Sequence, residues 1–316
     1  MPATLRPATA ADLPAIHAVN RRVEIADEVP IVTPLEEFED WLDDPHLSLE
    51  DDVRIVEMSG EPIGYGFVWH RPSDARESRA FVSGGIVPEY RRQGAGSLLL
   101  GWQLQRARDR VRTGPEELPR YIRTNAFESE AEAIALYESH GMRPIRYYDE
   151  LLRPLDSVPP VPELDGISLV AWEDARREEV RQVSNLAFAD HWGTSPVDAA
   201  AWNHRLDSYG TRLELSWIAL NGDRVVGLSI NGHFPSDQEL TGRLDGWVQT
   251  LGTHPEYRRR GIASALVLRS CHTFVEAGFT HAALGVDSEN PTGAYRLYQR
   301  LGFAPLHRSV SHQLEV

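Results

Sequence analysis

Two stretches of this sequence are nearly identical: "VPEYRRQGAGSLL" runs from Val87 to Leu99, and "HPEYRRRGIASAL" runs from His254 to Leu266. In each, a basic turn passes through a glycine into residues with helical spacing. Such a turn leaves backbone N–H groups free at the helix N-terminus, where helix polarity favours an anion by roughly 0.3 to 1 kcal/mol. A solvated basic turn would explain one copy, but two copies favour a pair of anion-binding loops. We expect a pyrophosphate as the anion.

The two loops belong to a longer repeat. Pro88 and Pro255, Gly64 and Gly227, and Tyr137 and Tyr298 recur at a nearly constant separation, which indicates a tandem duplication. A proline-rich stretch between the copies favours extended chain. We therefore expect an N-terminal domain over residues 1–153, a linker over 154–163 and a C-terminal domain over 164–316.

Each copy has the pattern of a mixed α/β domain. An amphipathic helix is followed by two strands around a turn, at Ser59-Gly60 in one copy and Asn221-Gly222 in the other. A further strand leads into the repeated loop and its helix, and a strand, a helix and a strand close the copy. The sequence predicts two units, each a mixed, mostly antiparallel twisted sheet flanked by helices.

The composition limits the class of protein. The chain has 41% hydrophobic and 25% charged residues, and no apolar run approaches the length of a membrane span. Its formal net charge of −15 disfavours binding to nucleic acid. The only cysteine, Cys271, fits a reducing compartment and is expected to be a packed helix residue. We expect a cytoplasmic protein, monomeric as an internal pseudo-dimer, that does not contact a membrane.

The repeated loops resemble a motif of the GNAT N-acetyltransferase superfamily, [QR]-x-x-G-x-[GA]. The resemblance covers nearly the whole chain as two units. It implies acetyl-CoA as co-substrate and no metal, with the pyrophosphate held by the loops and pantetheine by the backbone of the preceding strand. The expected CoA-binding residues are Leu251, Gly252, Thr253, Arg258, Arg259, Arg260, Gly261, Ile262 and Ala263 in the second copy, and Gly84 to Ile86, Arg91, Arg92, Gln93, Gly94, Ala95 and Gly96 in the first.

A second element of the C-terminal copy resembles the GNAT pattern N-x-x-A-x-x-L-Y-x-x-x-G-F. It begins at Asn290, a further expected CoA-binding residue, and includes Tyr298. The resemblance implies that Tyr298 is the general acid that protonates the leaving CoA thiolate, although a buried core tyrosine is the alternative. The first copy keeps Tyr137, but Ser129 stands at the position of Asn290. We therefore expect the first copy to be non-catalytic and able to bind CoA.

Candidates for the base and for the acceptor pocket come from the second copy. Aligning Pro88 with Pro255 places Asp245 opposite Ser78, so only the second copy has a carboxylate on that strand face. Asp245 is the first candidate for the catalytic base, with a solvated surface carboxylate as the alternative; Asp287 and His233 follow. Aromatic and imidazole side chains that could bind the acceptor, or could be core residues, are His191, Trp192, Trp202 and Trp247.

The resemblance implies an acetyltransferase, which we expect to act on a primary amine of a small molecule by direct attack. One alternative is a mycothiol-synthase-like acetylation of a cysteinyl amine, since the size and layout resemble those enzymes, although Trp247 stands where they are expected to have a carboxylate. Another alternative is a non-catalytic protein that binds or senses acyl-CoA.

Overall fold

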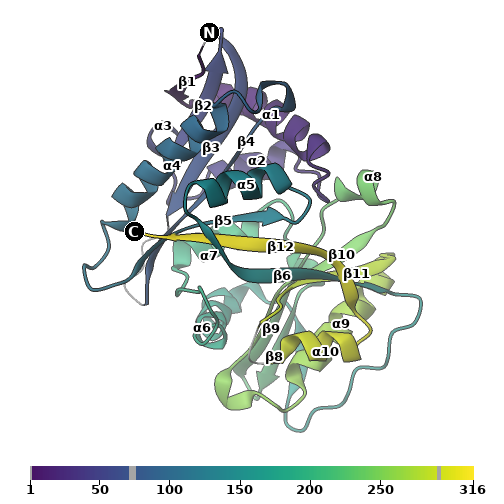
Figure 1. Ribbon diagram of the computed structural model, residues 1–316. Helices are drawn as coiled ribbons and strands as arrows, with labels where there is room; N and C mark the ends of the chain where they lie inside the picture. Colours follow the sequence, from purple (N-terminus) through teal and green to yellow (C-terminus); the bar gives the residue numbers. More distant parts are fainter. Residues whose placement is uncertain (1, 71–75, 290–292) are drawn as a thin grey trace. The chain divides into compact units, whose positions relative to one another are not determined.

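The computed structural model describes residues 2–70, 76–289 and 293–316 (Figure 1). The chain forms two compact units, one of Met1–Tyr147 with Ser309–Val316 and the other of Tyr148–Arg308. These units differ from the expected halves, 1–153 and 164–316, because the strand that ends each half pairs with a strand of the other half. The duplication is therefore folded with an exchange of its closing strands.

The sheet of unit 1 has the strand order β1-β2-β3-β4-β5-β12. Neighbouring strands are antiparallel except β4 and β5, which are parallel. From Ser309 onward, β12 pairs with β5. The strands are β1 (Thr4–Pro7), β2 (Val53–Met58), β3 (Glu61–His70), β4 (Ser78–Ile86), β5 (Arg120–Phe127) and β12 (Ala304–Glu315).

The sheet of unit 2 repeats this arrangement as β7-β8-β9-β10-β11-β6. Only β10 and β11 are parallel, and β6 pairs with β11 from Tyr148 to Pro154. The strands are β7 (Ser168–Ala171), β8 (Trp217–Asn221), β9 (Arg224–Gly232), β10 (Asp245–Thr253), β11 (His281–Asp287) and β6 (Arg143–Pro154). The mixed, mostly antiparallel sheets predicted from the sequence are confirmed.

Helices cover both faces of each sheet. In unit 1 a Cβ added to Gly85 of β4 would meet Val23 of α1, whereas one added to Gly66 of β3 would meet Leu99 of α4. The helices of this unit are α1 (Leu13–Ala26), α2 (Leu35–Leu42), α3 (Leu49–Asp52), α4 (Ala95–Val111) and α5 (Ala131–Ser139), with short 3₁₀ helices at Ala10–Asp12 and Pro88–Tyr90.

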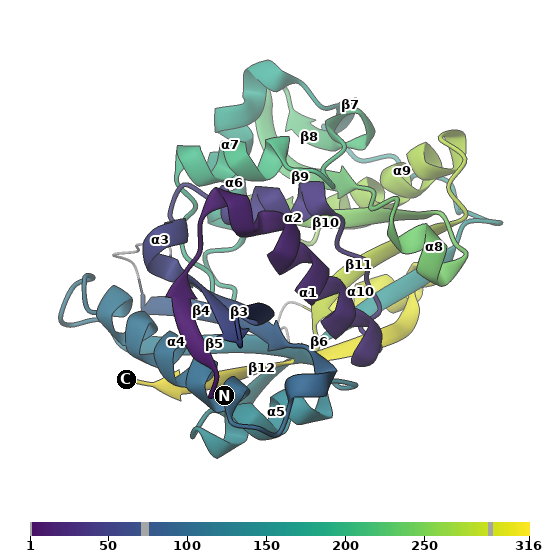
Figure 2. The same ribbon diagram turned by 90° about the horizontal axis from the view of Figure 1, so that it is seen from above.

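Unit 2 is layered in the same way (Figure 2). Gly252 of β10 faces Ala187 of α6, and Gly246 faces Phe274 of α9. The helices are α6 (Arg177–Ala187), α7 (Ala199–Asp207), α8 (Asp237–Thr241), α9 (Ile262–Glu276) and α10 (Ala294–Arg300), with 3₁₀ helices at Asp174–Arg176, Leu213–Leu215 and Pro255–Tyr257.

Cys271 is a residue of α9 and is buried in the core of unit 2, so it is a packed helix residue, as predicted. Burial raises the pKa of its thiol to about 11, so the thiolate nucleophile is scarce at neutral pH. Within the described residues, no helix is long and apolar enough to cross a membrane. The same ranges contain no cluster of three or more His, Cys, Asp or Glu side chains that could hold a metal ion.

A β-bulge distinguishes β10 from its counterpart β4. The pairing of β10 with β9 shifts between Val248 and Thr250, whereas β4 pairs with β3 without interruption. Gln249 is therefore an extra residue in the second copy. The alignment on the two prolines fails before this point: by their pairing with β9 and β3, Asp245 corresponds to Arg79 and Trp247 to Phe81, not to Ser78 and Ala80.

Candidate active site

In each unit the two parallel strands separate before they end. The β4–β5 pairing stops at Phe81 and Arg123, and the β10–β11 pairing stops at Val248 and Leu284. β10 continues to Thr253, still paired with β9 on its other side. The strand edge from Gln249 onward thus has backbone groups without a strand partner among the described residues. An extended amide-containing chain could form hydrogen bonds with them.

This edge includes Leu251, Gly252 and Thr253, the residues predicted to contact pantetheine, and Ile86 holds the matching position on β4. Leu251 packs beneath the strand against the core, so its backbone rather than its side chain is offered at the edge. A backbone contact with pantetheine, the role that the resemblance implies, would not depend on the identity of these side chains.

Both repeated loops have the same unusual backbone conformation. Arg92 and Arg259 have φ values of 61° and 63°, and Gly94 and Gly261 have φ values of 88° and 83°. Left-handed conformations are uncommon outside glycine, and alternating handedness turns successive N–H groups toward one point. Both loops thus have a nest-like backbone directly before a long helix, α4 or α9, a conformation that suits an anion.

The loop arginines divide into two kinds. Arg91 binds both carboxylate oxygens of Asp27 and donates to the Ile86 carbonyl, and this ion pair raises the pKa of Arg91. Arg258 donates to the carbonyl of Ala187 and to Asp190, at 2.9 and 3.2 Å. These two side chains anchor the loops to the C-terminal ends of α1 and α6, so they position the nest rather than enter it.

Arg92 and Arg259 are exposed and form no hydrogen bond or ion pair with the described residues. They are the better candidates for contact with a phosphate. Arg260 lies over the ring of Tyr257 and donates to the Asp165 carbonyl, and the other loop side chains are also engaged or point into the core. Gln93 donates to the Glu89 carbonyl, Ala95 and Ile262 are buried, and Gly96 and Ala263 are half-buried.

The two tyrosines differ in their hydroxyl groups. Burial raises the pKa of both Tyr137 and Tyr298 to about 12. The Tyr137 hydroxyl shares a hydrogen bond with Thr124, whereas the Tyr298 hydroxyl forms none with the described residues. Tyr298 therefore keeps its proton at neutral pH, and its ring lies in the core of unit 2. Asn290, expected near it, lies outside the described residues.

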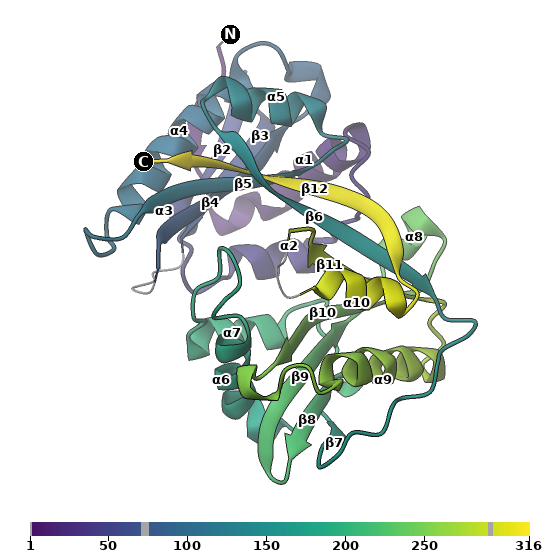
Figure 3. The ribbon, with the colours of Figure 1, turned by 60° about the horizontal axis from the view of Figure 1, so that its bottom comes forward.

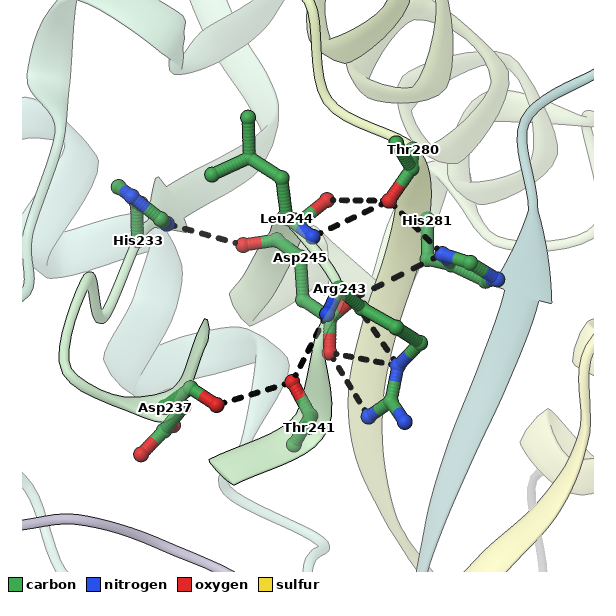
Figure 4. A network of polar contacts seen from close by, with 8 residues as sticks. All are labelled: His233, Asp237, Thr241, Arg243, Leu244, Asp245, Thr280 and His281. Atoms are coloured by element: carbon green, nitrogen blue, oxygen red, sulfur yellow. Dashed lines mark hydrogen bonds and ion pairs between the residues drawn. The ribbon is translucent and has the colours of Figure 1, made fainter. Parts of the chain in front are cut away.

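Asp245 is the first residue of β10 and pairs with His281 of β11, at the end where the two strands are still hydrogen-bonded (Figure 4). Its carboxylate accepts hydrogen bonds from Nε and Nη2 of Arg243, the shortest at 2.9 Å, and only 8% of the residue is exposed. Val248, the last paired residue, is three strand positions away, or about 10 Å at 3.3 Å per residue. This geometry favours a structural ion pair over the role of catalytic base.

We expect Asp245→Asn to lower the melting temperature, because Arg243 would lose its charged partner. Turnover at saturating substrate should fall less than about tenfold, below the usual range for loss of a positioned base. Asp207→Asn is the matched control, since it removes an exposed carboxylate from Arg177. Calorimetric melting and steady-state kinetics on both variants would check this. A hundredfold loss of turnover with an unchanged melting temperature would restore Asp245 as the base.

The two runner-up bases are also engaged. His233 Nδ1 lies 3.1 Å from the Asp245 carbonyl oxygen, and burial lowers the pKa of His233. Asp287 is 3% exposed, and its Oδ1 accepts from the backbone N–H of Glu289. Neither offers an unengaged carboxylate or imidazole at the point where β10 and β11 separate.

The four aromatic and imidazole candidates do not form one cluster. Trp202 is 1% exposed, packs with Val180 and Leu206, and donates its indole N–H to the Arg177 carbonyl, so it is a core residue. His191 stacks edge-on with Phe188 in the loop after α6, and Trp192 follows it. Only Trp247, which contacts Phe234 edge-on, lies on β10 next to the separating strands.

Sequence reasoning missed the polar residues of the bulge. Arg205 of α7 donates to the Thr250 hydroxyl at 2.7 Å, and Thr211 donates to the Gln249 side chain at 3.3 Å. The bulge places both side chains on the face covered by α7. A regular alternation would have sent one of them to the opposite face, so no sequence pattern signals the pair.

Comparison with known proteins identifies the family. The family model described as "Acetyltransferase (GNAT) family" matches residues 20–142 and 177–303, one match in each copy. The chain belongs to the GNAT acetyltransferase family. This tandem GNAT protein is an acyl-CoA-dependent N-acetyltransferase, as the repeated loops predicted.

Several named relatives resemble the chain over most of its length. A mycothiol acetyltransferase of Salinispora arenicola is 29% identical over 86% of this chain and 84% of its own length. One of Catenulispora acidiphila is 26% identical over 83% of this chain and 80% of its own length. These relatives, like this GNAT protein, are acetyltransferases.

Solved structures share the tandem fold. A GCN5-related N-acetyltransferase of Sphaerobacter thermophilus aligns with a TM-score of 0.75 at 27% identity, covering 99% of this chain and 95% of its own. A tandem GNAT protein of the clavulanic acid biosynthesis pathway aligns with a TM-score of 0.71 at 18% identity, covering 99% and 98%. At that identity the second match shows the fold alone.

Proposed function

We propose that this GNAT protein transfers the acetyl group of acetyl-CoA to the amine of a cysteinyl small molecule, and that unit 2 performs the reaction. The observation that carries the proposal is the similarity to mycothiol acetyltransferases along most of both chains. The cysteinyl amine, an alternative acceptor in the sequence analysis, is therefore better supported than an unspecified primary amine. We further propose that the protein acts in the cytoplasm as a monomer.

The proposed reaction is a direct attack of the amine on the thioester. The pyrophosphate binds the nest of Gly261, and pantetheine extends along the free edge of β10. A backbone N–H of that edge stabilises the oxyanion that develops on the thioester carbonyl. As the C–N bond forms and the C–S bond breaks, the amine loses one proton to a base and the CoA thiolate gains one from Tyr298.

The acceptor would lie on the face of β10 that carries Trp247. Trp247 and Phe234 offer an apolar aromatic surface beside the separating strands, where a thiol-bearing side chain can pack. A tryptophan at the position where a carboxylate was expected supports binding there but cannot accept a proton. The base must therefore come from another strand.

The proposal predicts a preference for thiol-bearing acceptors. Purified protein with acetyl-CoA should acetylate a cysteinyl amine at least about tenfold more efficiently, in kcat/KM, than its seryl analogue, since a single small group in a binding pocket contributes about 1–3 kcal/mol. CoA release and mass spectrometry of the product would measure this. Titration of the free thiol distinguishes N-acetylation from S-acetylation.

The possible outcomes test the proposed acceptor and the proposed acetyl transfer separately. Equal or better acetylation of the seryl analogue, or of amines without a cysteinyl group, would contradict the acceptor and leave the acetyltransferase intact. Binding of acetyl-CoA without acetylation of any amine would instead favour the non-catalytic acyl-CoA sensor considered from the sequence.

A further inference from the structure

The carboxylate of Glu150 faces the separating strands and takes part in none of the contacts described above. Strands β6 and β11 lie side by side (Figure 3), and their register places Glu150 of β6 directly opposite Gly285 of β11. Its neighbours Asp149 and Leu151 point to the other face, where Leu151 packs in the core and Asp149 binds Arg308. Glu150 therefore lies on the same face as Gly285 and, one strand further, Trp247.

The space beside Glu150 is open next to the point where β10 and β11 separate. Gly285 is the first residue of β11 beyond its last pair with β10, Leu284 with Val248. A Cβ added to Gly285 would meet no atom within 4 Å, and the residue is exposed. Opposed residues of antiparallel strands lie about 4.5–5.5 Å apart, so the Glu150 side chain borders this open space. The opening adjoins the strand edge proposed to hold the thioester arm.

The charge state of Glu150 suits proton transfer. The half-buried carboxylate forms no hydrogen bond or ion pair with the described residues. Burial, with a smaller effect from the like charge of Asp237 in α8, raises the pKa of Glu150 to about 7. Asp287 is a further carboxylate on this face of β11, and Tyr148 and Leu152 are the same-face neighbours on β6. A half-buried carboxylate without a counter-charge destabilises the folded protein. Carboxylates of this kind are typical of functional sites.

Unit 1 provides an internal comparison. The pair equivalent to Gly285 and Glu150, counted along the matching strands, is Asn125 and Ser311. Ser311 is 2% exposed, and neither side chain can accept a proton at neutral pH. The open, carboxylate-bordered position is thus specific to unit 2, the unit with the unbonded tyrosine hydroxyl.

We propose that Glu150 is the general base of unit 2, supplied by the exchanged strand β6. This inference rests on the proposed function. The Glu150 carboxylate takes one proton from the neutral acceptor amine, directly or through one water, as the amine nitrogen attacks the thioester carbon. Tyr298 returns one proton to the thiolate, so the step leaves an N-acetyl product, CoA, protonated Glu150 and deprotonated Tyr298, which solvent resets.

The test compares the wild type with Glu150→Gln across pH. We expect turnover to fall roughly 10²- to 10⁴-fold at pH 8, with unchanged affinity for acetyl-CoA by calorimetry. The ratio of wild-type to variant kcat/KM should rise about tenfold per pH unit and level off above about pH 7. Taking the ratio removes the ionisation of the acceptor itself. Glu150→Asp should recover part of the rate, and the exposed Glu163→Gln should match the wild type.

A second readout needs no activity. A folded-state pKa of about 7, above the ordinary value of about 4.3, means that the folded protein holds more protons than the unfolded chain between these values. Stability from this group is therefore lost as pH rises through that window. Glu150→Gln should melt near the wild-type temperature at pH 4.5 and higher than the wild type at pH 8.

The outcomes separate this inference from the proposed function. An active wild type with an equally active Glu150→Gln, or a rate ratio that does not change with pH, would overturn the base and leave the transferase standing. A melting difference that is constant with pH would also overturn it. A wild type that acetylates no amine would contradict the proposed function itself.

Discussion

Replacing Tyr298 by Phe should reduce turnover by roughly 10²- to 10⁴-fold while leaving the Michaelis constant for acetyl-CoA nearly unchanged. The substitution removes one hydroxyl from a residue that is 8% exposed and packs against Phe303. The hydroxyl has no hydrogen bond to the described residues, so its loss should not weaken the fold. The expected effect is therefore on the departure of the thiolate alone.

The first copy supplies the matched control. Tyr137 has the same place on α5 that Tyr298 has on α10, and burial raises the pKa of both to about 12. Tyr137→Phe removes a hydroxyl that binds Thr124, so it should cost some stability and little turnover. Stopped-flow and steady-state assays of CoA release would compare the two variants. Equal losses in both would mean that both units catalyse, and no loss in Tyr298→Phe would remove it as the acid.

The second large effect concerns the nests. Gly261→Val should weaken acetyl-CoA binding to unit 2 at least about a hundredfold, because a branched residue disfavours the φ of 83° that directs the N–H groups to one point. Losing two charge-assisted hydrogen bonds of about 1.5–3 kcal/mol each is enough for this effect. Calorimetric titration with acetyl-CoA measures both the affinity and the number of sites.

Two glycines control for strain and for location. Gly278 ends α9 with a φ of 86° and open space around an added Cβ, so Gly278→Val carries the same backbone cost away from either nest. Gly94→Val alters the nest of unit 1. We expect two sites in the wild type and in Gly278→Val, and one site in each nest variant. Two unchanged sites in Gly261→Val would contradict the assignment of the nest.

The loops could be predicted because their signal is local. Arg92 and Arg259 precede Gly94 and Gly261 at the same spacing, and the backbone conformation follows from these few consecutive residues. The helix stripe that includes Tyr298 is local in the same sense. The Tyr137 hydroxyl has Thr124 of β5 as a hydrogen-bond partner, whereas the Tyr298 hydroxyl has no partner among the described residues. This difference depends on a neighbouring strand, and no repeat in the sequence reveals it.

The base depends on contacts between distant parts of the chain. Glu150 falls within residues 1–153, so the sequence assigned it to the first copy. The exchange of closing strands places it beside Gly285 in unit 2. Each closing strand would pair with an equivalent strand whether or not the two closing strands were exchanged. Its hydrophobic pattern would therefore be the same in both cases. The pattern therefore cannot distinguish exchange from its absence, and a search confined to one copy could not find Glu150.

The bulge explains why the alignment on the two prolines fails upstream. Asp245 stood out because an alignment on Pro88 and Pro255 assumed equal strand lengths. One extra residue, Gln249, shifts the register upstream by one and reverses which face each side chain occupies. The carboxylate that the alignment favoured is bound to Arg243, at the end of the strand pair where the strands have not yet separated.

The central claim is that acetyl transfer takes place in unit 2. Its most direct test is product formation, followed by mass spectrometry, in two double variants assayed with acetyl-CoA and a cysteinyl amine. Gly94→Val with Tyr137→Phe disables the nest and tyrosine of unit 1, and we expect N-acetyl product at a rate within a few fold of the wild type. Gly261→Val with Tyr298→Phe should reduce it to background, whereas product from this second variant and none from the first would contradict the account.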